Sequence, residues 1–243
     1  MNRILFERDE IRGETAVFSG ERASHVLKIL HGEVGQILKT GEVGGKIGTS
    51  EILEIGETMK VRVCHETEAL GSWCDLILAP PRPRVMKRLL PNLATLGVGK
   101  IYLVGARKVE KDFWGATLLK EANYRPLFID GLMQGGVATE LPVIETRRNF
   151  RAFVNDELES LFPMSERILA HPPAGEAGSA SIEQQMGGAS GKRPLFAIGP
   201  EGGWTDEEVA LLEAHNFDRC SLGRRILRTD TAVVALLTRF MMN

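Results

Sequence analysis

The chain runs LFAIGPEGGWTDEE from residue 195 to residue 208, an apolar stretch followed by a glycine-rich loop and a polar segment. The apolar stretch, residues 195–198, predicts a short buried strand. Thr205 and Glu208 form the pattern of a capping box, which predicts that a helix begins directly after the loop. A strand that leads into a helix through a short loop is typical of a mostly parallel sheet with helices on both faces.

The same texture extends over the second part of the chain. A helical pattern of apolar residues covers residues 85–96, and Pro91 inside it is expected to kink or interrupt the helix. The segment 231–241 is apolar on nearly every side, so we expect a buried final helix with Thr229 as its N-cap. Further strands are expected at residues 75–79, 101–104, 167–170 and 219–222. This part of the chain is therefore predicted to have an α/β fold.

The first 72 residues have a different pattern. Apolar and polar residues alternate from Met59 to Cys64, which is the period of a half-buried strand, and glycines recur at turn-like intervals. The pattern predicts a small barrel or compact sheet. Residues 67–72 show no periodicity, so we place a boundary there, between a domain of residues 1–72 and a domain of residues 73–243. Residues 174–192 are rich in Gly, Ala and Ser and predict a mobile loop inserted between two strands of the second domain.

The composition is that of a globular protein. Of the 243 residues, 43% are hydrophobic and 26% are charged, with 30 basic and 32 acidic side chains. These ordinary fractions argue against disorder, collagen and coiled coil as the main organisation. No apolar run reaches the roughly 20 residues that a bilayer requires, and the N-terminus lacks a signal-peptide apolar region. Cys64, Cys74 and Cys220 form no Cys-x-x-Cys pair and are expected to be buried thiols in a reducing cytosol. We therefore expect a cytoplasmic protein.

Three of the predicted strands end in conspicuous loops, at His171, at residues 199–203 and at residues 223–225. In open α/β sheets, ligands bind beyond the carboxyl ends of the strands, so these loops are candidates for a binding site. They do not match the glycine patterns of the P-loop or of dinucleotide-binding folds. Residues 41–46 resemble a P-loop only superficially, because Thr40 and Ile47 replace the required glycine and hydroxyl. A tight structural turn remains the alternative interpretation of residues 199–203.

Two motifs, in the right order and at the right spacing, are similar to those of a known family. The first is IGPEGG at residues 198–203, and the second is LGRRILRTDTA at residues 222–232. Together they closely resemble the motifs of the RsmE group of SPOUT methyltransferases, which methylates uracil N(3) in 16S ribosomal RNA. Residues 24–35 resemble the opening of the PUA-like barrel of that family. Residues 94–98, ATLGV, are similar to its A-T-E-L-G-V segment but lack the glutamate.

The resemblance implies a fold, a cofactor and partners. It implies an α/β fold with an N-terminal PUA-like β-barrel and a C-terminal SPOUT domain that contains a trefoil knot, although true knots are nearly absent among folds. It also implies S-adenosylmethionine as cofactor, 16S ribosomal RNA as substrate and a homodimer that covers the final helix. The expected cofactor contacts are Ile198, Gly199, Glu201, Gly202, Ser221, Leu222, Gly223, Ile226 and Leu227.

Several conspicuous residues have a plainer interpretation. Trp204 is expected to close the hydrophobic core rather than to stack on adenine. His171 is expected to have its hydrogen bonds satisfied and not to act as a catalyst, and no metal is expected because no Cys or carboxylate set accompanies it. For the basic clusters at residues 107–111 and 147–151, a solvated face is the preferred interpretation. The cluster expected to contact RNA phosphates follows a predicted strand end and comprises Arg82, Arg84, Lys87 and Arg88.

Arg228 is the candidate catalytic residue. Uracil N(3) is a weak nucleophile until it loses its proton, and a guanidinium would stabilise the resulting anion. Arginine stays protonated and therefore is not the base, which the sequence does not identify. The alternative role for Arg228 is a structural salt bridge, for instance to Glu201. Two other functions stay open, namely methylation of another RNA site or a tRNA, and binding of RNA without catalysis.

Overall fold

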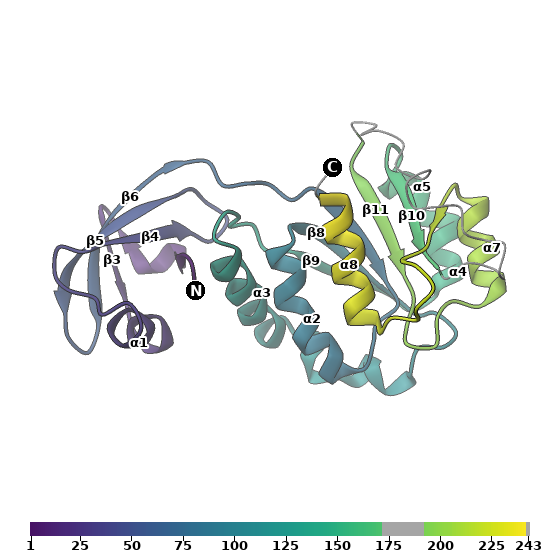
Figure 1. Ribbon diagram of the computed structural model, residues 1–243, viewed down its shortest axis with the longest axis horizontal. Coiled ribbons are helices and arrows are strands. Elements are labelled where there is room, and N and C mark those ends of the chain that lie inside the picture. The colour runs from purple at the N-terminus through teal and green to yellow at the C-terminus, as the bar shows by residue number, and fades with distance from the viewer. Residues whose placement is uncertain (172–191, 242–243) are drawn as a thin grey trace.

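The computed structural model describes residues 1–171 and 192–241. It has an N-terminal and a C-terminal lobe that lie end to end along the long axis of the molecule (Figure 1). The predicted loop at residues 174–192 lies outside the described residues except for Lys192. No helix in the described ranges is long and apolar enough to cross a membrane.

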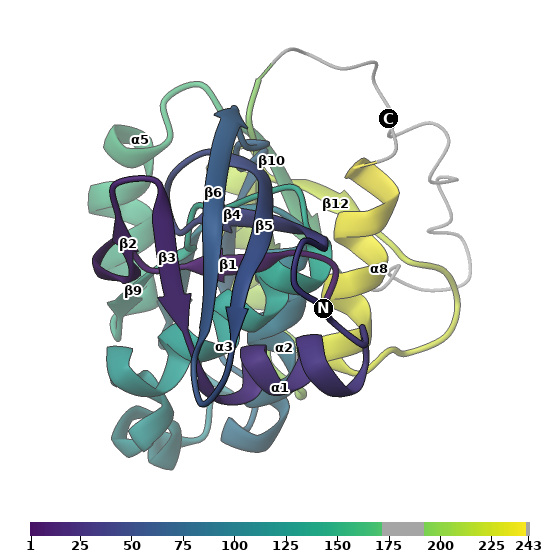
Figure 2. The same cartoon turned by 90° about the vertical axis from the view of Figure 1, so that its left-hand side faces the viewer.

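The N-terminal lobe is a curled, six-stranded mixed sheet in the order β1-β4-β5-β6-β3-β2, with one helix, α1, packed beside it (Figure 2). The strands pair antiparallel except for β1 with β4, which are parallel. Helix α1 covers Gly20–Lys28, a helix that the sequence pattern did not predict, and a short 3₁₀ turn, η1, covers Arg8–Glu10. The strands are β1 (Ile4–Phe6), β2 (Ile11–Arg12), β3 (Thr15–Phe18), β4 (Ile37–Glu42), β5 (Ile47–Ile55) and β6 (Met59–Thr67).

The long hairpin of β5 and β6 forms the centre of the sheet in this lobe. Val61 and Ile52 face each other across it and are fully buried, together with Phe6 and Val26. The alternation seen from Met59 onward thus buries Met59 and Val61 and partly buries Val63, as the sequence predicts. Cys64 points the other way and is exposed, so the prediction that all three cysteines are buried is wrong for this residue.

The C-terminal lobe confirms the predicted α/β fold. Its sheet is entirely parallel, in the order β12-β10-β11-β7-β8-β9. Helices cover both faces: α2, α3 and α8 pack on one side, and α4, α5 and α7 on the other (Figure 1). The strands are β7 (Cys74–Leu78), β8 (Val98–Val104), β9 (Val143–Arg147), β10 (Glu166–Ala170), β11 (Pro194–Ile198) and β12 (Asp218–Cys220). The helices are α2 (Pro83–Thr95), α3 (Glu121–Gly135), α4 (Phe150–Ala152), α5 (Leu158–Leu161), α7 (Asp206–Ala214) and α8 (Thr229–Met241), with short turns η2 (Lys111–Gly115), η3 (Thr117–Leu119) and η4 (Phe153–Glu157).

Three local predictions need correction. Helix α2 continues through Pro91 and ends at Thr95, so the proline does not interrupt it. Strand β12 stops at Cys220, two residues before the predicted end, and the following segment is the loop that leads to α8. Thr229 was predicted to be the N-cap of the final helix, but it is the first residue inside α8 and is buried. The first hydrogen bond of the helix runs from the Ala232 N–H to the carbonyl of Arg228 at 2.8 Å. Strand β9 was not predicted, because this short edge strand leaves Val143 half exposed and lacks a continuous apolar run.

The two lobes are joined by hydrogen bonds between the N-terminal segment and the region around α3. Arg3 donates to the carbonyl of Gly136 at 2.7 Å, and within its own lobe to the carbonyls of Thr40 and Gly48 at 2.7 and 2.8 Å. Glu7 forms an ion pair with Arg125 of α3. The N-terminal lobe is therefore held on the region around α3 by polar contacts, in addition to the covalent connection through residues 68–73.

Candidate active site

The candidate site lies at the carboxyl edge of the parallel sheet, where β10, β11 and β12 end. Strand β10 lies between the other two, and the His171 N–H after β10 donates to the carbonyl of Cys220 at 3.1 Å. The loops that follow β11 and β12 are thus about 10 Å apart, which is two strand spacings. The sheet order therefore brings residues 199–203 and 221–227 to one edge, as the sequence predicts from the strand ends.

The loop after β11 is a tight turn whose last glycine requires a left-handed backbone. The Gly203 N–H donates to the carbonyl of Pro200 at 2.8 Å, and Gly203 has φ of 67°. Gly199 is buried against Trp204, and a Cβ at Gly199 would meet the Trp204 backbone nitrogen at 3.1 Å. Both the structural interpretation of this loop and the ligand-binding one are compatible with its geometry.

Two contacts from other elements hold this loop in place. Lys108, in the loop after β8, donates from Nζ to the carbonyl oxygens of Gly202 at 2.8 Å and Trp204 at 3.4 Å. Glu201 accepts a hydrogen bond at 3.1 Å from the backbone N–H of Arg82, the N-cap residue of α2. The carboxylate of Glu201 thus braces the loop against α2, a role that the sequence did not indicate.

The helix after the loop begins as the capping box predicts. Glu208 accepts from the Thr205 N–H at 2.8 Å, and the Thr205 hydroxyl accepts from the Glu208 N–H at 3.3 Å. The same carboxylate also accepts from the backbone N–H of Arg107 at 2.7 Å. Glu208 therefore fixes the loop after β8 beside the start of α7.

The loop between β12 and α8 is open to solvent. Gly223 has φ of 101°, and its N–H donates to the Ser221 hydroxyl at 3.2 Å. Leu222 and Leu227 are half-buried, whereas Ile226 is 91% exposed. Ile226 therefore presents its apolar side chain to solvent.

Arg228 is exposed at the start of α8 and forms no ion pair with any residue that the structure describes. In particular, the Glu201 carboxylate binds the backbone of Arg82, so the proposed salt bridge between Arg228 and Glu201 is not formed. The helix N-terminus beside Arg228 adds partial positive charge to this position.

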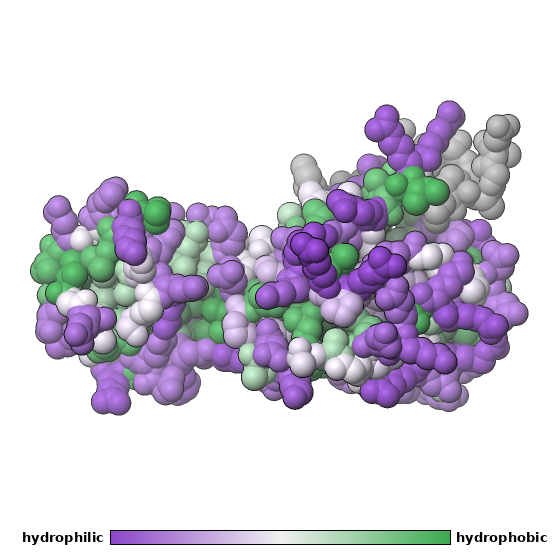
Figure 3. Space-filling view, turned by 90° about the horizontal axis from the view of Figure 1, so that it is seen from below, coloured by the Kyte–Doolittle hydropathy of each residue, from purple (hydrophilic) through white to green (hydrophobic). Residues whose placement is uncertain are grey.

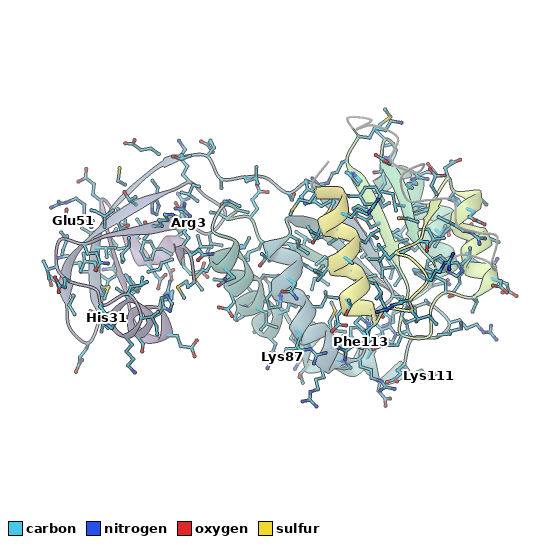
Figure 4. The ribbon with its side chains drawn as sticks, viewed as in Figure 1. Arg3, His31, Glu51, Lys87, Lys111 and Phe113 are labelled. Carbon is cyan, nitrogen blue, oxygen red and sulfur yellow. The ribbon has the colours of Figure 1, made fainter. Side chains whose placement is uncertain are left out.

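The four basic residues expected to contact RNA lie at the start of α2. Arg82 forms an ion pair with Glu110 at 3.0 Å, and Arg88 forms one with Asp230 in the first turn of α8 at 3.2 Å. Arg84 and Lys87 are exposed, and Lys87 projects from the lower edge of the C-terminal lobe, as does Lys111 (Figure 4). Arg82 and Arg88 therefore form ion pairs within the protein, whereas the side chains of Arg84 and Lys87 are exposed to solvent.

The plainer interpretations of Trp204 and His171 have different outcomes. Trp204 is 4% exposed and stacks on Phe150 at 5.2 Å between ring centroids, so it closes the core as predicted. His171 is not satisfied: its Nδ1 is buried with no hydrogen-bond partner among the described residues, and burial, assisted by the charge of Arg219, lowers its pKa. Within residues 1–171 and 192–241, no group of three or more His, Cys, Asp or Glu side chains could hold a metal ion.

The two loops fit the cofactor that the resemblance implies. A Cβ built on Gly203 or Gly223 meets no atom within 4 Å, so there is open space beside both loops. Backbone groups are available at residues 199–203, and Leu222 and Leu227 of the second loop are half-buried. Backbone groups and aliphatic side chains of this kind are compatible with a nucleoside that carries an aliphatic chain.

Comparison with known proteins identifies the family of this chain. Residues 69–241 match the RNA methyltransferase domain family. The chain is 31% identical to ribosomal RNA small subunit methyltransferase E of Treponema pallidum, over 97% of this chain and 88% of that protein. It is 26% identical to ribosomal RNA small subunit methyltransferase E 1 of Borreliella burgdorferi, over 97% of this chain and 95% of that protein.

Solved structures with the same fold span the whole chain. A Legionella pneumophila protein solved with bound SAM has a TM-score of 0.73 and 24% identity, covering 99% of this chain and 97% of that one. Ribosomal RNA small subunit methyltransferase E from Neisseria gonorrhoeae, bound to S-adenosyl methionine, has a TM-score of 0.70 and 20% identity, covering 100% and 97% of the two chains. At these identities the likeness establishes a shared two-lobed fold.

Proposed function

Because the chain belongs to the RNA methyltransferase domain family, within its ribosomal RNA small subunit methyltransferase E group, we propose that it methylates uracil N(3) in 16S ribosomal RNA with S-adenosylmethionine. The observation that carries this proposal is the placement of the IGPEGG and LGRRILR segments at one edge of the sheet, on either side of β10. The Treponema pallidum and Borreliella burgdorferi relatives are named for ribosomal RNA methylation and match nearly the whole chain.

We place the cofactor between these two loops. The proposed contacts are Ile198, Gly199, Glu201, Gly202, Ser221, Leu222, Gly223, Ile226 and Leu227. The backbone of residues 199–203 would bind its polar edges, and Leu222, Ile226 and Leu227 would bury its apolar parts. Lys108 and Glu201 would keep the first loop in the shape that binding requires, since each connects it to a different element.

When bound, the cofactor supplies a methyl group on a sulfonium, which is transferred by in-line displacement. The task of the protein is to align the uracil N(3) with that methyl group, and alignment of this kind contributes several kcal/mol to catalysis. Arg228 would hold its guanidinium beside the uracil oxygens, where the negative charge lies after the N(3) proton has left. Its exposed position and the lack of an ion-pair partner among the described residues support this role.

Finer features of the fold and of the assembly also belong to this proposal. We propose that the N-terminal sheet is a PUA-like barrel within a domain of residues 1–72 that recruits RNA, and that the domain of residues 73–243 contains a trefoil knot around the β12–α8 segment. We also propose a homodimer that covers the β12–α8 loop and α8. The exposed Ile226 and the half-exposed Met241 support it, because a dimer interface there would bury their apolar side chains. Arg84 and Lys87, together with Arg82 and Arg88, would contact RNA phosphates. The working location would be the cytoplasm, where ribosomal subunits are assembled.

Nucleoside mass spectrometry of ribosomal RNA from cells with and without the gene tests the proposal. Loss of N(3)-methyluridine from 16S ribosomal RNA, with its return upon complementation, is the expected result. Loss of a different methylated nucleoside, or of one in tRNA, would assign the enzyme to another substrate. Unchanged nucleosides together with retained RNA binding would identify a binding protein without catalytic activity.

A further inference from the structure

A cavity of about 460 Å³ lies at the carboxyl edge of the sheet, next to the candidate active site. It is bounded by the ends of β8 and β9, by α4 and by the start of α7. Thr205, which ends the loop after β11, also lines this cavity. We call it the arginine pocket, and its lining residues are Gly105, Arg107, Arg148, Asn149, Phe150, Arg151, Thr205, Glu207, Glu208 and Leu211.

The pocket is formed from the two basic clusters that the sequence pattern assigned to solvated faces. Arg107 comes from the loop after β8, and Arg148 and Arg151 come from the segment after β9, about 40 residues further along the chain. Strands β8 and β9 are parallel neighbours, so their carboxyl ends lie side by side and carry both clusters to one place. The arginines are exposed, as a solvated face requires, and the strand order shows in addition that the two clusters are neighbours.

Gly105 permits the two segments to approach. Its N–H donates to the carbonyl of Arg147 at 2.9 Å, and a Cβ at position 105 would overlap the backbone carbonyl of Arg148. No side chain larger than hydrogen fits between the two strand ends. The arginines on either side are thus held close by the backbone and do not depend on flexible loops.

Two of the three arginines are available to a ligand. Neither Arg107 nor Arg148 forms an ion pair through its side chain with a residue in the described ranges, and the Arg148 guanidinium lies 5.6 Å from the ring centroid of Trp114. That stacking orients the planar guanidinium without neutralising it. Arg151 is 3.9 Å from Glu207, a weak pair between two largely exposed side chains.

The two carboxylates in the pocket offset only part of this charge. Glu208 is buried, and its oxygens accept from the backbone N–H groups of Arg107 and Thr205, so it serves the framework of the pocket. Glu207 is 80% exposed at the rim, where water screens its charge. Arg107, Arg148 and Arg151 thus outnumber the two carboxylates that line the pocket, and guanidinium groups are well suited to binding phosphate oxygens.

We propose that the arginine pocket binds the phosphodiester backbone of the substrate RNA beside the uracil that is methylated. That the ligand is RNA rests on the proposed function. That the ligand is an anion rests on the arginines of the pocket alone. Lys108 spans the distance between the two sites, since it lies next to Arg107 and its Nζ bonds to the carbonyl of Gly202. A strand held by phosphate in the pocket would therefore pass directly to the cofactor loops.

The test compares RNA binding by Arg148→Gln and by the triple variant Arg107→Gln/Arg148→Gln/Arg151→Gln with that of the wild type. The matched control is Lys100→Gln, which removes one exposed positive charge near the opposite end of β8. The probe is transcribed 16S ribosomal RNA at several salt concentrations, with the full chain saturated with S-adenosylmethionine. We expect the triple variant to bind RNA at least about 10-fold more weakly at low salt. The slope of log affinity against log salt concentration should decrease by about 1 or more, which corresponds to at least one lost phosphate contact. Arg148→Gln should show part of this loss and Lys100→Gln should show none.

A variant that has lost only RNA contacts should keep its cofactor affinity and its melting temperature, whereas a damaged fold should lower both. If the triple variant is unstable, Arg148→Gln alone, at an exposed position, carries the test. Equal RNA affinity and equal salt dependence for Arg148→Gln and Lys100→Gln would overturn the inference, even if the wild type methylates ribosomal RNA. Conversely, arginine-dependent RNA binding by a protein that transfers no methyl group would leave the pocket standing and remove the proposed function. Calorimetry with inorganic phosphate alone separates the two sources of phosphate. Tight phosphate binding that Arg148→Gln abolishes, with RNA affinity unchanged, would assign the pocket to a small anion and overturn the RNA assignment.

Discussion

The Nζ atom of Lys108 lies 2.8 Å from the carbonyl oxygen of Gly202, and its aliphatic chain lies directly over that glycine. The two residues are 94 positions apart in the chain. A charged donor on a carbonyl restrains the loop through a hydrogen bond stronger than one between neutral groups. The loop after β11 thus owes its position to the loop after β8.

Lys108→Met tests this restraint, because methionine keeps much of the aliphatic chain and loses the donor. We expect S-adenosylmethionine to bind about 5-fold more weakly, since a hydrogen bond to a charged group at this exposed position contributes about 1 kcal/mol. Calorimetry is the measurement, and Lys111→Met in the neighbouring turn is the control. Equal affinity for the two variants would show that Lys108 does not shape the cofactor loop.

Gly202→Val should prevent cofactor binding. A Cβ at Gly202 would meet the Lys108 Cδ at 3.0 Å, and the branched side chain of valine would displace Lys108 and occupy space beside the loop. Gly203→Ala should weaken binding through a different cause, the cost of a positive φ for a residue with a Cβ, which is about 1 kcal/mol. Calorimetry on folded protein checks both. Unchanged affinity in Gly202→Val would place the cofactor elsewhere.

Arg228→Ala should lower methyl transfer by about 10²- to 10³-fold while leaving cofactor affinity and melting temperature unchanged. The structure supports the second half of this expectation, because Glu201 pairs with the Arg82 backbone and not with Arg228. Arg228→Lys should recover only part of the rate, since an ammonium does not reproduce a planar two-pronged donor. Single-turnover assays at saturating cofactor and RNA make the comparison, with Arg224→Ala in the same exposed loop as control. A loss of melting temperature or cofactor affinity in proportion to activity would indicate a structural role instead.

Arg3→Met should loosen the N-terminal lobe. The Arg3 guanidinium bonds to three carbonyl oxygens, one of which, that of Gly136, belongs to the C-terminal lobe. Its loss leaves these acceptors without a charged donor at a cost of about 2 kcal/mol, which corresponds to a decrease of roughly 4–8 °C in melting temperature for a protein of this size. Differential scanning calorimetry measures the shift, and Arg12→Met, at an exposed position of β2, is the control. A shift no larger than that of the control would mean that other contacts suffice to hold the lobe.

The ion pair of Glu159 with the buried Arg167 should make stability depend on pH in acid. Hydrogen bonds from Arg167, at 2.9 Å for one pair of atoms, lower the pKa of Glu159 from 4.5 to about 2. The charged carboxylate therefore stabilises the fold fully above about pH 5, and this contribution is lost as the pH falls from about 4.5 through about 2. Glu159→Gln should be less stable than the wild type at pH 7, and the difference should shrink as the pH approaches 2. Urea unfolding at several pH values checks this, with Glu14→Gln as an exposed control; a pH-independent difference would contradict the prediction.

Local pattern by itself determined much of this protein. The apolar run before IGPEGG, the capping box at Thr205 and Glu208, and the alternation after Met59 each specify an element through contacts within a few residues, and the structure contains all three. The strand ends also located the candidate cofactor loops at one edge of the sheet, since carboxyl ends of parallel strands share an edge.

Only the tertiary structure decided which distant residues meet. The arginine pocket depends on β8 and β9 being neighbours and on Gly105 allowing their ends to touch, and strand order is a property of the whole sheet. In the same way Glu201 could equally have met Arg228, and the packing of α2 gave it the backbone of Arg82 instead. Such contacts join residues about 40 to 120 positions apart, and their geometry follows from the burial of entire faces of helices and strands, which no short stretch of sequence encodes.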